Sequence, residues 1–372
     1  LLISRLLLVS ALVVMGVLVW KNWDSLAPAE LFDWIDQKIT GGTGGSGFPV
    51  SISGNTVVAL SPVKSGVGVL TDTSLLLMDA NGAELMRRSH TYARPMLRTA
   101  GDYLLMAELG GTRFQLETRK ETVFSGTVAN DIRSVAVSPD GLVAVVTAST
   151  KSYLSEMVVF DKTGKEIFHW YSTELMATDV ALRRDGKQAA VIGLSTEKGA
   201  MKSTLLVLDI QSGATEPVAS HSGTDVLLCA VSFLSNGQVA AVGDTACWLF
   251  TADAENPACV PVSYADRELL GYAVGDKGIA LALRHYGANE DGELLLTDAG
   301  GTVIGTAAFE GDFRHLAKAE DGFYLLTATR LYQVADGSLA ANREVPGDGL
   351  MVTTLKDEAL VLGLTALQTY AF

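Results

Sequence analysis

The chain has 372 residues, of which 48% are hydrophobic and 19% are charged, and its formal net charge at pH 7 is −14. This composition excludes a disordered protein and permits a large buried core. The acidic surface argues against nucleic acid as a partner, because it repels phosphate and no cluster of Lys or Arg interrupts it.

Residues 1–23 predict a single transmembrane helix. The uninterrupted apolar run at 6–20 corresponds to roughly 22 Å of helix, and the preceding residues extend it to about 30 Å if Arg5 snorkels to the surface. Trp20 and Trp23 suit the membrane interface. A cleaved signal peptide is the alternative, but the small residues that follow match a cleavage site poorly. We therefore expect a membrane anchor here.

Residues 24–47 predict a short amphipathic helix and a glycine-rich linker. Pro28 fits the first helical position, and Gly41 follows the helix as a stop. The apolar residues between them share one face, and the acidic residues share the other. The linker GGTGGSG has a root-mean-square reach of about 15 Å. A folded domain after it would stay close to the membrane.

From residue 48 onward the chain predicts short β-strands in a repeat of about 40 residues. The clearest copies begin at Ser134, Asp179 and Cys229. Such a period is typical of repeat architectures, because one four-stranded unit cannot bury its own faces and must stack on its neighbours. The strands form eight units, and most of the turns after each first strand carry Asp or Asn, which favour tight hairpins.

The last unit has only three strands before the chain ends, whereas residues 48–53 precede the first complete unit without a partner. The economical arrangement is a ring in which this N-terminal strand completes the last blade and leaves no open edge. We therefore predict an all-β fold, a single eight-bladed β-propeller over residues 48–372. Seven blades is the alternative count, since the second and eighth units are degenerate, and a linear solenoid is the competing architecture.

Parts of the sequence resemble known propellers. The stretch VFDKTGKEIFHWY, from Val159 to Tyr171, resembles the repeat of quinoprotein-type eight-bladed propellers, in which Asp, Thr-Gly and Trp lock neighbouring blades together. The copies AVSPDG and ALRRDG resemble repeats of the TolB-like group. These likenesses cover single blades and imply only the fold.

A broader resemblance covers almost the whole chain, including AELFDWIDQKI, the glycine-rich tether, GFPVSIS and VSFLSNGQVAAVGD. The sequence is similar to an uncharacterised membrane-anchored propeller family of clostridial Firmicutes, classed as a domain of unknown function. The resemblance implies the propeller, the anchor and an extracytoplasmic location with a basic cytoplasmic tail. It supplies no catalytic residues.

No catalytic or cofactor motif stands out in the sequence. There is no G-x-S-x-G elbow, no P-loop and no G-x-G-x-x-G between a strand and a helix. A quinone is poorly supported, because only one unit carries the full Asp, Thr-Gly, Trp pattern, and we interpret Trp170 as structural. We therefore predict a protein that is not an enzyme and holds no cofactor. The histidines are scattered without metal-ligand spacing: His90, His169, His221, His285 and His315.

All three cysteines, Cys229, Cys247 and Cys259, lie in the fifth unit. We expect three reduced thiols. The alternative is a disulfide between Cys247 and Cys259 across the outer hairpin, which would stabilise the fold by about 2–3 kcal/mol and leave Cys229 as a buried thiol.

An acidic residue recurs at the start of the innermost strand in six units. In a propeller these positions surround one mouth of the axial channel, where carboxylates can hold a hard cation such as Ca²⁺ or attract a cationic ligand. We favour a plainer interpretation, that Asp suits turns and accepts backbone hydrogen bonds at strand starts. The weak metal candidates are Asp131, Asp179, Asp225, Glu268, Asp312 and Asp348.

The loops between second and third strands should lie on the same face, and three of them are long, at 150–155, 196–202 and 286–292. Polar loops on a rigid ring are typical places for partner binding, although linkers without a role are the alternative. The candidate partner-binding residues are Lys151, Lys198, Lys202 and Tyr286.

These features together predict a single-pass protein of the cell membrane whose propeller lies outside the cytoplasm. We predict that it acts as a protein-interaction scaffold for envelope proteins. The alternative is a sensor that binds a cation or small ligand at the channel mouth, and an enzyme is the third class.

Overall fold

The computed structural model describes residues 47–52, 56–149, 152–253, 255–287, 291–346 and 348–372. The chain divides into two units, Leu1–Gly45 and Ser46–Phe372. The predicted transmembrane and amphipathic helices fall in the first unit, outside the described residues, and stay predictions. Within the described ranges, no helix has the length and apolar character needed to cross a membrane.

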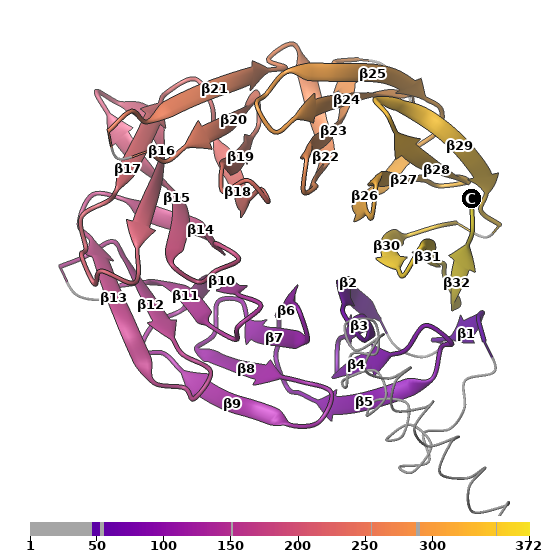
Figure 1. The fold of residues 1–372 in the computed structure, drawn as a ribbon, viewed down its shortest axis with the longest axis horizontal. Helices are drawn as coiled ribbons and strands as arrows, with labels where there is room; N and C mark the ends of the chain where they lie inside the picture. The colour runs from indigo at the N-terminus through magenta and orange to yellow at the C-terminus, as the bar shows by residue number, and fades with distance from the viewer. Residues whose placement is uncertain (1–46, 53–55, 150–151, 254, 288–290, 347) are drawn as a thin grey trace, which may run out of the picture. The chain divides into compact units, whose positions relative to one another are not determined.

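The second unit is a closed ring of eight four-stranded antiparallel sheets around a common axis (Figure 1). In each sheet the chain moves from an inner strand near the axis to an outer strand at the rim. The predicted eight-bladed propeller is confirmed, and the seven-bladed and solenoid alternatives are wrong.

Seven blades are built from consecutive strands. Blades 1 to 3 comprise β2 (Val57–Val63), β3 (Gly66–Thr71), β4 (Ser74–Met78) and β5 (Glu84–Ser89); β6 (Pro95–Ala100), β7 (Tyr103–Glu108), β8 (Arg113–Glu117) and β9 (Thr122–Thr127); and β10 (Ile132–Val137), β11 (Val143–Ala148), β12 (Ser155–Phe160) and β13 (Glu166–Ser172). Blades 4 and 5 comprise β14 (Met176–Leu182), β15 (Gln188–Glu197), β16 (Ala200–Asp209) and β17 (Ala219–Gly223); and β18 (Leu228–Phe233), β19 (Val239–Gly243), β20 (Ala246–Thr251) and β21 (Ala258–Ser263). Blades 6 and 7 comprise β22 (Arg267–Val274), β23 (Gly278–His285), β24 (Gly292–Asp298) and β25 (Val303–Phe309); and β26 (Phe313–Ala319), β27 (Gly322–Thr327), β28 (Arg330–Ala335) and β29 (Ser338–Glu344).

The eighth blade joins the two ends of the domain. Its inner strands are β30 (Met351–Leu355), β31 (Glu358–Leu362) and β32 (Ala366–Tyr370), and its outer strand is β1 (Val50–Ser51). Val50 lies opposite Leu367, and the Ile52 backbone N–H donates to the Thr365 carbonyl at 3.0 Å. Figure 1 shows β1 beside β32. The predicted closure of the last blade by the N-terminal strand is confirmed.

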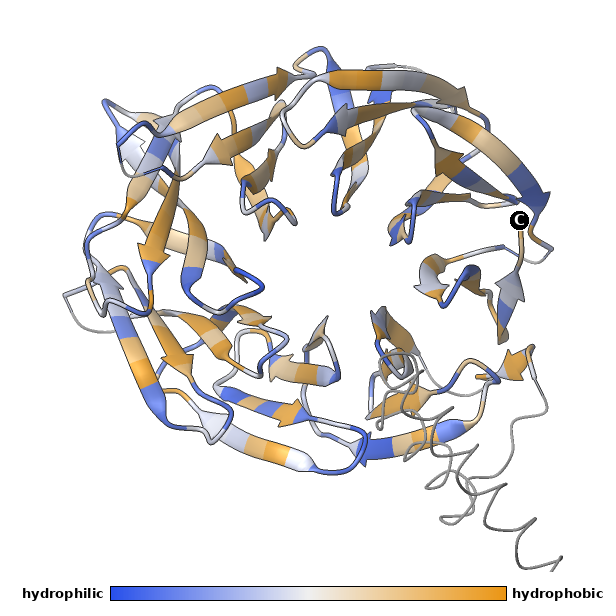
Figure 2. Ribbon diagram, viewed as in Figure 1, coloured by the Kyte–Doolittle hydropathy of each residue, from blue (hydrophilic) through white to orange (hydrophobic). Residues whose placement is uncertain are grey.

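The hydrophobic core lies between neighbouring blades. Strands such as β4 are buried at every position because another blade covers each of their two faces. Trp170 on β13 is 5% exposed and packs in one cluster with Ala177 and Leu206 of blade 4, so it joins two blades as the sequence predicted. Figure 2 shows hydrophobic residues along the strands and mostly hydrophilic residues in the connections.

Alternating strand directions give the ring two faces of different construction. The turns from first to second strand and from third to fourth strand lie on one face, which we call the turn face. The connections from second to third strand and from one blade to the next lie on the other, which we call the loop face.

On the turn face, an Asp at the end of a third strand organises the following turn in several blades. The Asp161 carboxylate accepts from the Thr163 backbone N–H at 2.8 Å and from the Lys165 N–H at 3.1 Å, and Asp298 accepts from the Thr302 N–H at 2.8 Å. Such bonds replace backbone partners in tight turns. The Asp-x-Thr-Gly stretch that resembles quinoproteins is therefore a turn device here.

The structure corrects one predicted loop. Residues 196–202 form the end of a long hairpin, because β15 and β16 stay paired until Glu197 lies opposite Ala200. Lys198 and Gly199 make the turn with positive φ angles of 52° and 86°. The polar composition of this segment suggested a loop, but Thr and Met in it pair as strand residues.

Six inner strands carry a β-bulge near the loop face. In six blades the pairing of first and second strand shifts by one residue, which bulges one residue of the inner strand. Over their described strands, blades 2 and 8 pair without this shift, and they are the two units whose sequence repeat is degenerate. The bulged residues are Val58, Arg133, Thr178, Cys229, Leu270 and Arg314.

Candidate binding surfaces of the ring

The six acidic residues at the inner-strand starts do lie on the loop face, but they serve different local contacts. Glu268 pairs with Arg284 at 2.8 Å, and Asp312 pairs with Arg314 at 3.3 Å. Asp131, Asp225 and Asp348 are exposed. In the described part of the chain, no three His, Cys, Asp or Glu side chains are grouped so that they could hold a metal ion.

Asp179 differs from the other five because it directly follows the bulge in its inner strand. Its Oδ1 accepts from the Ser134 hydroxyl of blade 3 at 2.5 Å, and its Oδ2 accepts from the Val231 backbone N–H of blade 5 at 3.0 Å. Inner strands have an unpaired edge toward the axis, and the carboxylate satisfies one donor of that edge. One side chain therefore joins the inner strands of three blades, which sequence spacing did not reveal.

The thiol of Cys229 lies near this carboxylate. Burial raises the pKa of the Cys229 thiol, and the negative charge of Asp179 raises it further. Burial also raises the pKa of Tyr272, the neighbouring hydroxyl at the axis, to about 12. Both groups stay protonated at neutral pH, so neither is an activated nucleophile or base there.

The other two cysteines cannot form the disulfide considered from sequence. Cys247 on β20 lies opposite Val262, and Cys259 on β21 lies opposite Phe250. The two thiols are therefore offset by an odd number of positions and point to opposite faces of the sheet. Cys247 belongs to the core between blades 5 and 6, whereas Cys259 packs against the core between blades 4 and 5. The disulfide alternative is wrong, and all three cysteines are free.

His169, His221 and His315 make separate structural contacts. The His169 ring stacks on Tyr171 with centroids 4.1 Å apart on the rim of blade 3. His315 Nδ1 accepts from the Val352 backbone N–H at 3.5 Å and so links blade 7 to blade 8, and burial lowers the pKa of His315. The His221 ring meets the edge of Trp248 at 4.7 Å. The contacts of His221 and His315 join neighbouring blades, whereas His169 and Tyr171 lie on the same strand.

The loop face carries many exposed apolar side chains. They lie at the tips of connections or at the first residues of strands, where no neighbouring blade covers them. Tyr286, which the sequence analysis named as a candidate for partner binding, is 67% exposed. The set comprises Tyr153, Leu154, Met176, Met201, Leu227, Tyr286, Leu350 and Leu364.

The predicted partner-binding residues belong to this surface. Lys198 and Lys202 lie at the tip of the β15–β16 hairpin, and Lys202 pairs with Glu197 at 2.9 Å. Tyr286 follows β23. Lys151 lies outside the described residues. A pocket of about 320 Å³ opens on the same face between blades 1 and 2, beside Tyr92 and Arg113.

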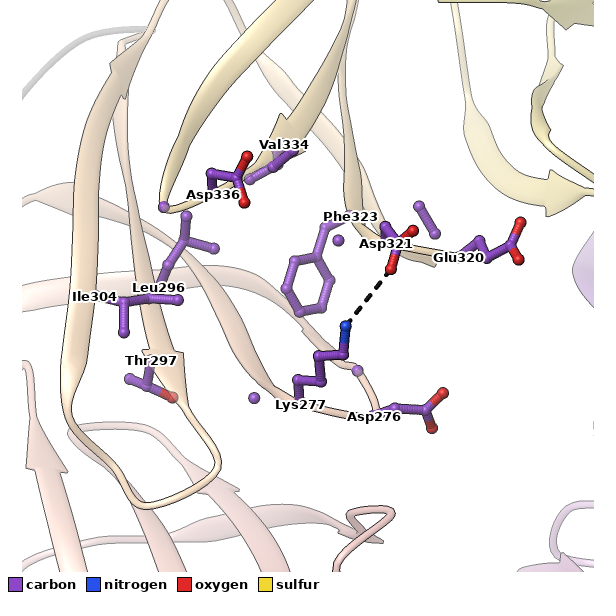
Figure 3. Close-up of a pocket in the computed structure, with 16 residues that line it drawn as sticks. Asp276, Lys277, Leu296, Thr297, Ile304, Glu320, Asp321, Phe323, Val334 and Asp336 are labelled. Atoms are coloured by element: carbon purple, nitrogen blue, oxygen red, sulfur yellow. Dashed lines mark ion pairs between the residues drawn. The ribbon is translucent and has the colours of Figure 1, made fainter.

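The turn face is hollowed in a way that the sequence did not show. Three of the pockets in the described part of the chain open there, with volumes of about 470, 330 and 380 Å³. The first lies between blades 6 and 7 (Figure 3), the second beside blades 8 and 1, and the third near the axis. Glu320 lines the first and second pockets, and Asp276 lines the first and third. The first hollow therefore adjoins each of the other two.

A glycine of blade 6 lines the first pocket at the start of the second strand. In blades 2 and 3, the side chains at the matching position, Tyr103 and Leu142, lie against Gly141 and Gly186 in the hairpin of the next blade. The matching residue of blade 6 is Gly278, and a Cβ there would overlap the Thr297 carbonyl oxygen of its own blade. Only glycine therefore fits this position without a shift of the backbone.

The chain matches a protein family over most of this ring. Residues 50–346 match the family of unknown function DUF5711. The chain belongs to this family. The match begins after the segment predicted to span a membrane, so the anchor and the clostridial origin implied by the resemblance stay predictions. A search of curated proteins finds no match.

Solved structures share the fold at low sequence identity. BamB from Moraxella catarrhalis is 12% identical, with a TM-score of 0.56 over 87% of this chain and 98% of that one. Sqt1 from Saccharomyces cerevisiae is 10% identical, with a TM-score of 0.62 over 87% and 98%. The C-terminal WD40 domain of Sif2 is 13% identical, with a TM-score of 0.59 over 88% and 99%. These likenesses establish the propeller fold.

Proposed function

We propose that this protein is a protein-interaction scaffold whose loop face binds a partner protein. The observation that carries the proposal is the set of exposed apolar side chains that a rigid ring holds on that face. Apolar side chains that gather on one surface typically mark a contact with another macromolecule. Lys198 adds positive charge at one edge, since Lys202 beside it is paired with Glu197, and this charge suits an acidic patch on the partner.

The groups at the axis favour binding over catalysis. The pKa of the Cys229 thiol is raised, and the Asp179 carboxylate is used by two neighbouring blades. Fold alone assigns no activity to a propeller. The proposal therefore rests on the exposed side chains of the loop face. A cation sensor is disfavoured because Glu268 and Asp312 already pair with Arg284 and Arg314.

We also propose that the N-terminal segment holds the ring at the outer side of a cell membrane, among envelope proteins. The support is the apolar run at 6–20 and the short linker after it. The chain enters the ring at Gly47, which lies against Gly82 in the β4–β5 turn on the turn face. The loop face is thus on the side of the ring away from this point and free to meet a partner.

Photo-crosslinking in the native host tests the scaffold. A photoreactive amino acid is placed at Leu227 on the loop face, and a matched one is placed at Ile167 on β13, since the two side chains are 41% and 42% exposed. We expect the same envelope protein to be captured from Leu227 and from Tyr286, and not from Ile167. Equal capture from all three positions, or none, would contradict the proposal.

The anchor has its own test. Replacing Val13 and Val14 with Arg places two charges in the middle of the apolar run, which opposes insertion. We expect the variant to leave the membrane fraction, whereas Leu at both positions keeps it there. Protease added outside spheroplasts should digest the ring of the wild type. Protection of the ring would contradict the proposed orientation.

A further inference from the structure

The pocket between blades 6 and 7 has apolar walls beneath a charged rim. Leu296 and Ile304 of blade 6 face Phe323 and Val334 of blade 7 across a space of about 470 Å³. Figure 3 shows these four side chains around the hollow. The volume is within the range of sites that bind small molecules or a few side chains.

The rim carries more negative than positive charge. Asp276, Glu320, Asp321 and Asp336 line the pocket, with Lys277 as the lining cation. The carboxyl of Asp357 beside Glu320 raises the pKa of Glu320 through a hydrogen bond and through charge repulsion. Asp276 is held by Lys318 of blade 7 at 2.7 Å. A cationic group would therefore be attracted to the remaining carboxylates.

Lys277 already shows where such a cation would lie. Its side chain reaches across the pocket, and its Nζ lies 3.6 Å from Asp321 Oδ1 (Figure 3). The two side chains are 90% and 87% exposed, and exposed pairs of this kind contribute little stability. An incoming Lys or Arg can take over Asp321 at little cost.

We propose that this pocket binds an extended segment of a partner polypeptide in which a Leu- or Met-sized side chain is adjacent to a Lys or Arg. The apolar side chain lies against Ile304, which is 55% exposed, and Phe323, and the cation pairs with Asp321 or Asp336. This site is on the turn face and goes beyond the loop-face docking proposed above.

A polypeptide fits this surface better than a small cation does. The pocket adjoins the other two hollows of the turn face through Glu320 and Asp276, so the depression is longer than one small molecule. Its apolar walls require an apolar group beside the charge, and a peptide supplies both from neighbouring residues.

A phage-displayed library of random heptapeptides, selected on the full chain in detergent micelles, tests the proposal. We expect enriched sequences that combine Lys or Arg with Leu, Met, Ile or Val. A synthetic copy of the most enriched peptide, labelled with fluorescein, is then titrated against variants. Its affinity should fall as salt is raised, because charge contributes to binding.

Two adjacent residues of β25 supply a matched pair of variants. Ile304 lines the pocket and is 55% exposed, whereas Val303 is 49% exposed and is not among the residues that line the pocket. Ile304→Lys should weaken the peptide roughly tenfold or more, and Val303→Lys should leave it unchanged. Asp321→Asn with Asp336→Asn should weaken it as well, without removing any apolar wall.

Three results would overturn the proposal. They are no enrichment, enrichment of sequences that lack a basic residue, and equal loss of affinity in the Ile304→Lys and Val303→Lys variants. Thermal unfolding of each variant shows that the ring is intact. Failure here leaves the loop-face crosslinks of the scaffold test unaffected, so the two proposals can be distinguished.

Discussion

The two faces of the ring are built on different principles. On the turn face, short Asx turns and glycines bring backbones of neighbouring strands into direct contact, and three pockets open between and beside the blades. On the loop face, connections vary from tight hairpins to long links and end in exposed apolar side chains. We therefore expect the turn face to tolerate few substitutions and the loop face to tolerate more.

The sharpest test compares one glycine from each face. A Cβ at Gly278 on the turn face would overlap the Thr297 carbonyl, whereas a Cβ at Gly199 on the loop face meets no heavy atom within 4 Å and has only its positive φ to oppose it. Gly278→Ala should lower the free energy of unfolding by about 3 kcal/mol, and Gly199→Ala by about 1 kcal/mol. Urea unfolding followed by tryptophan fluorescence measures both. Equal losses would remove the distinction between the faces.

A smaller effect is expected from the acids at the inner-strand starts. Asp179→Ala removes an acceptor used by Ser134 and by the Val231 backbone N–H, and we expect a loss of about 2 kcal/mol. Asp131→Ala changes an exposed side chain and should cost less than about 0.5 kcal/mol. Thermal unfolding at one pH compares the two variants. If Asp131→Ala were the more destabilising, the inter-blade role of Asp179 would be refuted.

The smallest effect is a pH dependence at the link between blades 7 and 8. Burial lowers the pKa of His315 below its usual 6.5, so the folded ring keeps the imidazole neutral while the unfolded chain takes up a proton. The contribution of His315 to stability is therefore complete above about pH 6.5 and is lost as the pH falls through the folded-state pKa. His315→Asn keeps an acceptor for Val352 and removes the titration.

Urea unfolding of the wild type and of His315→Asn at several values between pH 7.5 and pH 5 measures this difference, on the scale where histidine titrates. The variant should lose less stability over the interval than the wild type does. Parallel curves for the two proteins would show that His315 does not titrate in the folded ring as described.

Most of the fold followed from sequence because each blade repeats the same local chemistry. The turn after the first strand of blade 8 carries Asp357, as the repeat pattern indicated for most of these turns, and Lys356 has a φ of 52° there. Blade 1 departs from the pattern, because β2 continues through Pro62 to Val63 and turns at residues 64–65. Pro is tolerated there because β2 is the inner edge strand, where one N–H is not needed for pairing.

The candidate sites were only partly predictable. The loop-face positions of Lys198, Lys202 and Tyr286 follow from strand order alone. The bonds of Asp179 do not, since Ser134 and Val231 belong to other repeats and meet it only in the closed ring. The pocket between blades 6 and 7 escaped the sequence analysis because its lining residues belong to two repeats that meet only in the folded ring.

The pairing of β1 with β32 also determines when the ring can close during synthesis. Val50 leaves the ribosome at the beginning of the domain, yet its partner Leu367 is among the last residues of the domain to be made. Until then β1 has no strand to pair with, and the apolar face of blade 1 that packs on blade 8 is exposed. The nascent ring is therefore prone to aggregation until β32 is made, and truncation before β32 would leave it open permanently.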